Sequence, residues 1–226
     1  SSMTPLEREF MLYLPLYDGV TSLSIGVDSL STISSPHLAI PTREKPVICY
    51  GTSITQGGCV TRAGMSYTNI LGRKMNREVI NLGFSGNGQL DYEIAELMRS
   101  RKDAGLYILD FIPNVNLKQI REKTARFVEI LRSENSEIPI LFVELIIFPH
   151  SIYDRNIFNT VAEKNRALKE EFEKLEAAGD KNIHYLSAKD LIGQDGETTV
   201  DGIHLTDLGS VRLAEELFRK IEEITP

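Results

Sequence analysis

Short apolar runs alternate with longer amphipathic stretches along most of this chain, from about residue 45 to its end. The apolar runs cover residues 46–50, 78–82, 105–111, 138–145 and 182–186. Each run is nearly continuous in apolar character, which is typical of a parallel strand that helices cover on both faces. The alternation itself predicts that successive strands are joined by helices.

The amphipathic stretches have the spacing of helices. They cover residues 66–76, 90–101, 117–134, 159–178 and 208–221. In the third stretch, Ile130 and Leu131 follow Phe127 by three and four positions, so one helix face is apolar. We therefore expect an α/β fold, a three-layer α/β/α sandwich with a five-stranded parallel sheet. Its functional residues should gather at the carboxyl ends of the strands.

Residues 1–44 have a different pattern from the α/β domain that we predict for residues 45–226. Residues 9–17 and 20–27 have the character of two strands, and Asp18-Gly19 between them is a favourable hairpin turn. Because a lone hairpin is marginal in water, these strands should pack on the α/β body or end a β domain cut off upstream. We favour the second interpretation of this N-terminal β-hairpin segment.

Composition excludes several classes of function. The chain has 226 residues, 42% of them hydrophobic, and a formal net charge of −7, which disfavours a nucleic-acid partner. No apolar run approaches the roughly 20 residues of a membrane span, and we find no secretion leader. The two cysteines make no disulfide framework and the four histidines lack metal-ligand spacing, so we expect no metal and no cofactor.

The segment CYGTSITQG, residues 49–57, turns small and polar directly after the first apolar run. It is not a phosphate-binding P-loop, because Gly51 and Gly57 are one residue too far apart and no lysine follows. The GFSGNG segment of residues 83–88 has the reverse of the dinucleotide-binding spacing. Nucleotide binding is therefore not predicted at either loop.

A serine nucleophile is the other chemistry that places a hydroxyl at a strand end. Ser53 would need a base, a group that orients the base, and donors for an oxyanion. The G-x-S-x-G elbow is absent. However, Asp201 and His204 lie three residues apart in a loop before the last helix. Asp201 could hold one ring nitrogen of His204, leaving the other to take the Ser53 proton.

Two further strand ends offer hydrogen-bond donors. The glycines of residues 81–88 let backbone N–H groups approach a ligand closely. Asn114 follows the third apolar run, and its amide can donate to an oxyanion where a carboxylate could not.

Together, Ser53, Gly86, Asn114 and the Asp201/His204 pair resemble the four conserved blocks of the SGNH (GDSL-like) hydrolase superfamily. The resemblance covers about residues 46–221 and implies the flavodoxin-like SGNH hydrolase fold. It implies that Ser53 is the nucleophile, His204 the base and Asp201 its orienting acid. It also implies an oxyanion hole made by the N–H groups of Ser53 and Gly86 and the side chain of Asn114.

The sequence departs from the family pattern at two blocks. Thr52 replaces the aspartate of Gly-Asp-Ser, and Ile112 and Val115 replace the outer residues of Gly-x-Asn-Asp. These positions bear on the substrate range. Thr52, Asn87 and His150 are candidate substrate contacts.

The chain is similar to a bacterial subgroup in which the hydrolase domain follows a small β-sandwich and which is thought to contain carbohydrate esterases. Residues 1–44 would then be the tail of a truncated β-sandwich. This resemblance implies a metal-independent serine esterase that removes acetyl-like groups from a small-molecule or glycan ester, in the periplasm or outside the cell. The alternatives are a thioesterase or lysophospholipase, and a non-catalytic carbohydrate-binding module on the same fold. The oligomeric state stays open.

Overall fold

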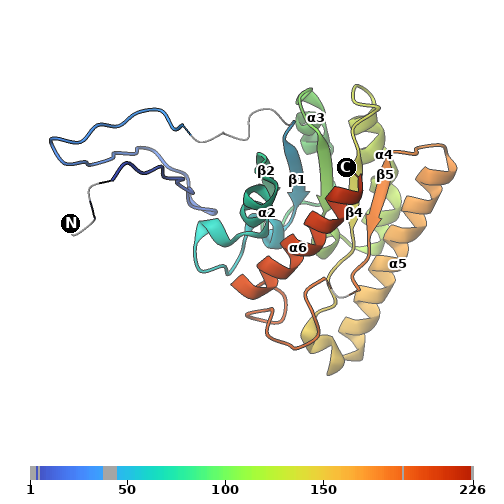
Figure 1. The fold of residues 1–226 in the computed structure, drawn as a ribbon. Coiled ribbons are helices and arrows are strands. Elements are labelled where there is room, and N and C mark those ends of the chain that lie inside the picture. The colour runs from blue at the N-terminus through green and yellow to red at the C-terminus, as the bar shows by residue number, and fades with distance from the viewer. Residues whose placement is uncertain (1–3, 5, 38–44, 190, 225–226) are drawn as a thin grey trace.

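The computed structural model describes residues 4, 6–37, 45–189 and 191–224. Five parallel strands form one sheet in the order β2-β1-β3-β4-β5 (Figure 1). The strands are β1 Val47–Gly51, β2 Val79–Gly83, β3 Leu106–Asp110, β4 Ile140–Val143 and β5 Ile183–Leu186. The predicted five-stranded parallel sheet is confirmed, and its order is that of flavodoxin-like folds.

Helices cover both faces of the sheet, which confirms the three-layer sandwich. They are α1 Ser53–Gln56, α2 Tyr67–Met75, α3 Tyr92–Ser100, α4 Leu117–Arg132, α5 Arg155–Ala177 and α6 Asp207–Ile224, with 3₁₀ helices η1 Ala63–Met65, η2 Ile112–Asn114 and η3 Pro149–Ile152. Helices α2 and α6 pack together on one face, and α3, α4 and α5 pack on the other (Figure 1). Among the described helices, none is both long enough and apolar enough to cross a bilayer.

The core is densest around the two central strands. Every residue of β1 and β3 is buried, as expected for parallel strands that are covered on both faces. Tyr50 of β1 stacks on Phe127 of α4 with ring centroids 5.1 Å apart, which ties the sheet to that helix layer. The apolar face expected for the helix that contains Phe127 is therefore the face that packs on the sheet.

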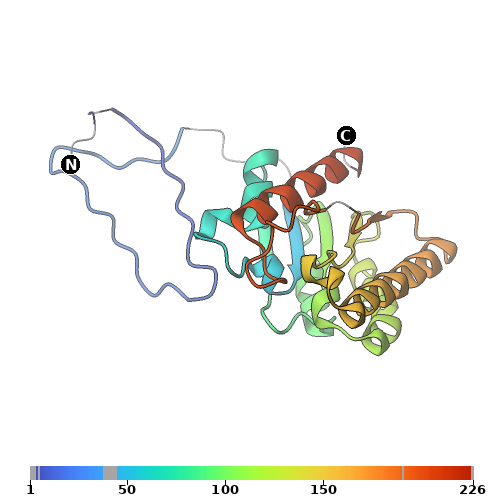
Figure 2. The same ribbon diagram turned by 90° about the horizontal axis from the view of Figure 1, so that it is seen from below.

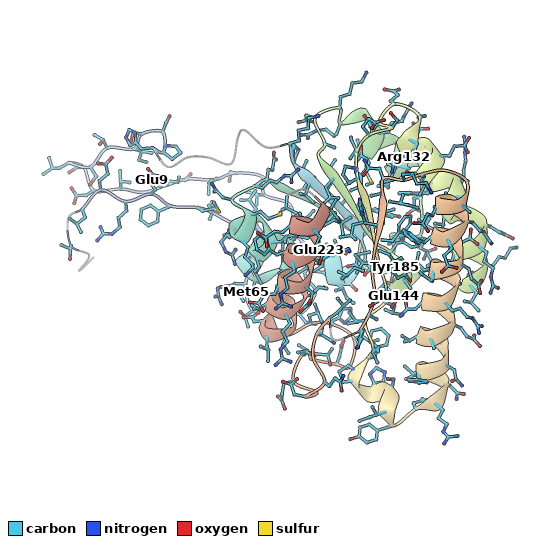
Figure 3. All side chains as sticks on the ribbon, turned by 45° about the vertical axis from the view of Figure 1, so that its right-hand side comes forward. Glu9, Met65, Arg132, Glu144, Tyr185 and Glu223 are labelled. Atoms are coloured by element: carbon cyan, nitrogen blue, oxygen red, sulfur yellow. The ribbon has the colours of Figure 1, made fainter. Side chains whose placement is uncertain are left out.

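A polar contact joins the ends of β4 and β5 beneath α5. Figure 3 shows Tyr185 and Glu144 side by side, and the Tyr185 hydroxyl donates to Glu144 Oε1 over 2.6 Å. The other oxygen of Glu144 accepts the backbone N–H of Ala188 at 2.6 Å. Because both carboxylate oxygens are bonded, Glu144 is satisfied in this partly buried position.

The N-terminal segment differs from its prediction. Residues 6–37 form extended runs that lie to one side of the α/β body (Figures 1 and 2), and no strand is assigned within this described segment. The predicted hairpin of residues 9–27 is therefore not formed. Its apolar side chains are exposed, Phe10 to 79%, so the two runs bury too little surface to hold a ladder together.

One part of the N-terminal segment does contact the body. Gln56 of α1 donates its side-chain amide to the carbonyl of Leu16 over 2.9 Å. Arg73 of α2 donates to the Tyr13 hydroxyl at 2.9 Å and lies over the same ring, 5.3 Å from its centroid. These contacts place Tyr13 and Leu16 beside the turn that follows β1.

Strand register brings three chain segments to one level at the carboxyl edge of the sheet. Gly51, the last residue of β1, is level with Gly83 of β2 and with Asp110 of β3. The segments that follow these strands carry Ser53, Gly86 and Asn114, so all three leave the same carboxyl edge of the sheet, those of Ser53 and Asn114 on either side of the switch point between β1 and β3.

Candidate active site

The turn after β1 places Ser53 at the start of a helix. Thr52 Oγ1 accepts the N–H of Ile54 at 3.3 Å, and Thr55 Oγ1 accepts the N–H of Thr52 at 3.3 Å, which makes a capping box. Ser53 is the first residue of α1, where a backbone N–H has no intrahelical acceptor. The sequence predicted only a polar loop here.

Three predicted catalytic side chains form a continuous hydrogen-bonded chain. Ser53 Oγ lies 2.9 Å from His204 Nε2, and His204 Nδ1 lies 2.6 Å from Asp201 Oδ2. Hydrogen bonding to His204 is the main cause that holds the pKa of Asp201 well below its ordinary value. A hydroxyl, an imidazole and an ionised carboxylate in this order can activate the hydroxyl as a nucleophile.

The loop before α6 is folded so that the histidine ring faces Ser53. Asp201 Oδ1 accepts the backbone N–H groups of Ile203 at 2.9 Å and of His204 at 2.8 Å. The N–H of Val200 donates to the carbonyl of His204 over 2.8 Å. Asp201 therefore uses one oxygen to shape the turn and the other to orient the ring.

His150 packs against this same loop. A Cβ added to Gly202, whose φ is +90°, would lie 2.3 Å from His150 Nδ1, so glycine is required there for both backbone and space. The His150 ring stacks on Phe148, with centroids 5.7 Å apart. Its buried Nδ1 has no hydrogen-bond partner among the described residues. The substrate contact expected of His150 stays a prediction.

The donors expected to form an oxyanion hole lie in the turn after β2 and at the end of η2. Gly86 adopts φ +67°, and the adjacent N–H of Asn87 closes the turn on the Phe84 carbonyl at 3.0 Å. The Asn114 amide donates to the carbonyl of Asn87 and, at 3.4 Å, to that of Phe84. Within the described part of the chain, the N–H groups of Ser53 and Gly86 have no acceptor. Their roles stay predictions.

Of the remaining predicted substrate contacts, Thr52 lies in the turn directly before Ser53. Its side chain is fully buried and its hydroxyl caps α1, so the residue shapes the turn that carries Ser53, and its contact with substrate stays a prediction. Asn87 is exposed and remains a candidate contact.

A buried polar cluster beneath α1 was not anticipated from the sequence. Asp110 Oδ2 accepts the hydroxyls of Thr55 at 2.9 Å and of Tyr67 at 3.0 Å. Burial raises the pKa of Asp110 to about 6, against the opposing effect of these two hydrogen bonds. The cluster joins β3, α1 and α2 directly below Ser53. The signal for this cluster in the sequence was Asp110 itself, an acidic residue at the end of an otherwise apolar strand.

Cys59 lies in the same loop region as Ser53, as the sequence indicates, although no catalytic role was expected of it. Its thiol is exposed and lies beside the side chains of Asp201 and His204. These are the only three His, Cys, Asp or Glu side chains of the described residues grouped closely enough to hold a metal ion.

Comparison with known families covers nearly the whole chain. Residues 44–222 match the GDSL-like Lipase/Acylhydrolase family, and residues 1–33 match the N-terminus of SGNH-hydrolase-type esterases. No curated protein matches the sequence.

Solved structures agree with the fold. A Bacteroides ovatus protein assigned as a GDSL-like lipase is 36% identical, with a TM-score of 0.88 over 94% of this chain and 62% of its own. The salicylyl-acyltransferase SsfX3 of a tetracycline biosynthetic pathway is 22% identical, with a TM-score of 0.68 over 80% of this chain and 55% of its own. A Clostridium thermocellum family 3 carbohydrate esterase is 15% identical, with a TM-score of 0.62 over 80% of this chain and 97% of its own. This chain thus spans less than two thirds of the first two proteins.

Proposed function

The chain belongs to the GDSL-like lipase/acylhydrolase family, and from that premise we propose that it is a metal-independent serine esterase that removes small acyl groups, such as acetyl, from carbohydrates. One observation carries the proposal: Ser53 Oγ, the His204 ring and the Asp201 carboxylate are linked by contacts of 2.9 Å and 2.6 Å. This is the arrangement that serine hydrolases need before substrate arrives.

The proposed reaction uses these side chains in sequence. His204 Nε2 accepts the Ser53 proton as Oγ attacks the ester carbonyl, and Asp201 stabilises the imidazolium. The N–H groups of Ser53 and Gly86 and the amide of Asn114 stabilise the oxyanion. His204 then donates its proton to the leaving alcohol. Water, deprotonated by the same ring, releases the acyl group and restores Ser53.

The openness of the site supports a substrate with a large alcohol part. The Asp201 side chain is 47% exposed and that of His204 28%, while Ser53 is 8% exposed, so a large alcohol part can stay on the open side of the site while a small acyl group approaches Ser53. The similarity of fold to a family 3 carbohydrate esterase agrees with this choice of substrate.

Exposed apolar side chains beside the site support a second candidate, a thioesterase or lysophospholipase. Helix η3 lies against the loop of His204, and its Ile152 is 75% exposed, followed by Tyr153 at 88%. Ile203 of the loop itself is 38% exposed. Such a surface could receive a long acyl chain, because burying it there would remove apolar area from water.

Acyl-chain preference separates these candidates. The experiment compares hydrolysis of p-nitrophenyl acetate and p-nitrophenyl octanoate by the wild type and by Ser53→Ala. We expect turnover of the acetate, little of the octanoate, and neither in Ser53→Ala. A preference for octanoate would favour the second candidate. Equal inertness of both proteins would contradict an enzyme and favour a non-catalytic carbohydrate-binding module.

We also propose that residues 1–44 are a structural unit separate from residues 45–226, as the tail of a β-sandwich. The separate family match of residues 1–33 supports this division. So do the extended path and exposed apolar side chains of residues 6–37.

A further inference from the structure

Three side chains with different donor atoms meet at the solvent-facing edge of the active site. One ligand atom each of Cys59, Asp201 and His204 lies within 4.8 Å of the other two. Thiolate, imidazole and carboxylate are the ligands that zinc takes in proteins, and three protein ligands leave a fourth position for water. Cys59 and Asp201 are exposed, so an ion can reach the cluster from solvent.

The loop that carries Cys59 is held in place on both sides. Before it, the N–H of Gly57 donates to the Ser53 carbonyl over 3.0 Å. After it, Thr61 donates its N–H and its hydroxyl to the two carboxylate oxygens of Asp207, at 3.0 Å and 2.6 Å. The backbone on either side of Cys59 is thus held relative to both the turn that carries Ser53 and the start of α6. A ligand set that is already positioned loses less conformational freedom when the ion binds.

The residue before Cys59 lies directly against the histidine ring. A Cβ added to Gly58 would be 3.2 Å from Cδ2 of His204. The same Cβ would lie 2.9 Å from the Tyr17 hydroxyl, so position 58 leaves little space for a side chain and the backbone before Cys59 passes close to His204.

We propose that Cys59, His204 and Asp201 form an inhibitory site for a zinc ion, in addition to the catalytic role of the histidine and the aspartate. On binding, the Cys59 thiol releases its proton to solvent, and the thiolate and a ring nitrogen of His204 donate electron pairs to the ion. Asp201 either completes the ligand set or holds the other ring nitrogen, as carboxylates do at many zinc-bound histidines.

A zinc ion at this site would inhibit the proposed hydrolysis because His204 is also the proposed base. Its Nε2 contacts Ser53 and its Nδ1 contacts Asp201, so both ring nitrogens already have partners. An ion on Nε2 removes the base from Ser53, and an ion on Nδ1 removes the carboxylate that orients the ring. Zinc and catalysis therefore exclude each other whichever nitrogen binds. The inhibition rests on the proposed esterase function, whereas binding of the ion does not.

The kinetic test titrates zinc sulfate into the wild type and into Cys59→Ala during hydrolysis of p-nitrophenyl acetate. We expect zinc to inhibit the wild type and EDTA to restore it. Cys59→Ala should keep the basal rate and need at least about tenfold more zinc, because even supporting residues of a metal site change affinity by that factor. Equal zinc sensitivity of the two proteins, or faster hydrolysis with zinc, would overturn the proposal.

A spectroscopic test needs no activity. Cobalt(II) is added to Ser53→Ala, which retains all three ligands, and thiolate-to-cobalt charge-transfer absorption is recorded in the near ultraviolet. We expect this band in Ser53→Ala and not in Ser53→Ala combined with Cys59→Ala. Cys59→Gly provides a second substitution, because position 59 has φ 67°, which glycine adopts easily.

The two tests separate the proposals. The other cysteine, Cys49, is fully buried in β1 and offers no thiol to added cobalt. If the wild type hydrolyses no ester but the cobalt band depends on Cys59, the proposed function fails and the metal site stands. If the band is absent, or persists without Cys59, the metal site is wrong whatever the activity.

Discussion

Ser53 Oγ and His204 Nε2 lie 2.9 Å apart, although 151 positions of sequence separate the two residues. The sheet explains this closeness, because the turn after β1 and the loop before α6 both lie at the carboxyl edge. His204 in turn depends on Asp201, which both shapes its loop and bonds its ring.

Replacing Asp201 by asparagine should remove most activity while preserving the fold. One oxygen of Asp201 accepts two backbone N–H groups, so the asparagine oxygen should remain there and its NH₂ should face Nδ1. The NH₂ would donate to Nδ1 and fix the proton on Nε2, where it blocks acceptance of the Ser53 proton. The same change in a serine protease lowers kcat about 10⁴-fold. A kcat within tenfold of wild type would contradict the orienting role.

Replacing Asn114 by alanine tests its role as an oxyanion donor. We expect kcat for p-nitrophenyl acetate to fall by roughly 10²–10³, the usual effect of losing one donor. Asn159→Ala is the control, because Asn159 is an exposed asparagine on α5 with no proposed role in the site. Urea unfolding should show that both variants are folded. An unchanged rate in Asn114→Ala would remove Asn114 from the oxyanion hole.

Asp110 should make stability depend on pH in the opposite direction to most carboxylates. Its folded-state pKa is raised from 3.8 to about 6 by burial, so the folded protein holds this proton more tightly than the unfolded chain. The resulting stabilisation is fully present below pH 4 or so and is lost as pH rises through about 6. Its size is on the order of 3 kcal/mol, because the pKa rises by about two units and each unit corresponds to about 1.4 kcal/mol.

The measurement compares urea unfolding of wild type and Asp110→Asn between pH 4 and pH 7. Asparagine can still accept the hydroxyls of Thr55 and Tyr67 but does not titrate. The difference in free energy of unfolding between the two proteins should therefore change across this interval in favour of the variant. A difference that is constant with pH would mean that Asp110 does not titrate there.

Two glycines of the turn after β2 should respond differently to alanine. Both adopt positive φ, +67° at Gly86 and +71° at Gly88, which costs roughly 1–2 kcal/mol for any other residue. A Cβ at Gly86 meets nothing within 4 Å, whereas one at Gly88 would lie 2.2 Å from the Gly51 carbonyl oxygen. Gly88→Ala should therefore lower the free energy of unfolding by clearly more than Gly86→Ala. Equal losses in urea unfolding would contradict this close approach.

The arrangement of the α/β body could be read from the sequence because its signals are local. Continuous apolar runs such as that of β3 mark strands buried on both faces, and the spacing around Phe127 marks a helix with one apolar face. The catalytic residues were found by a different route. Ser53 and His204 are unremarkable singly, and only their positions at strand ends, together with the family pattern, pointed to a common site.

Other features depend on contacts that no local pattern encodes. The approach of Cys59 to His204 arises from the path of the loop after α1, and the hydroxyls of Thr55 and Tyr67 reach Asp110 only once three elements have packed. The predicted hairpin of residues 9–27 is absent from the described structure because a favourable local pattern is not sufficient for strand formation. Its turn and strand propensities are favourable, but strands need a surface to bury, and the described structure supplies none for them.

The most direct test of the central claim is labelling with a fluorophosphonate, because attack on phosphorus requires an activated serine. Wild type, Ser53→Ala and His204→Ala are incubated with the reagent, and the modified residue is identified by mass spectrometry. The proposed triad predicts one adduct on Ser53 in the wild type and none in either variant. An unlabelled wild type, or an adduct on another residue that persists in Ser53→Ala, would contradict Ser53 as the nucleophile.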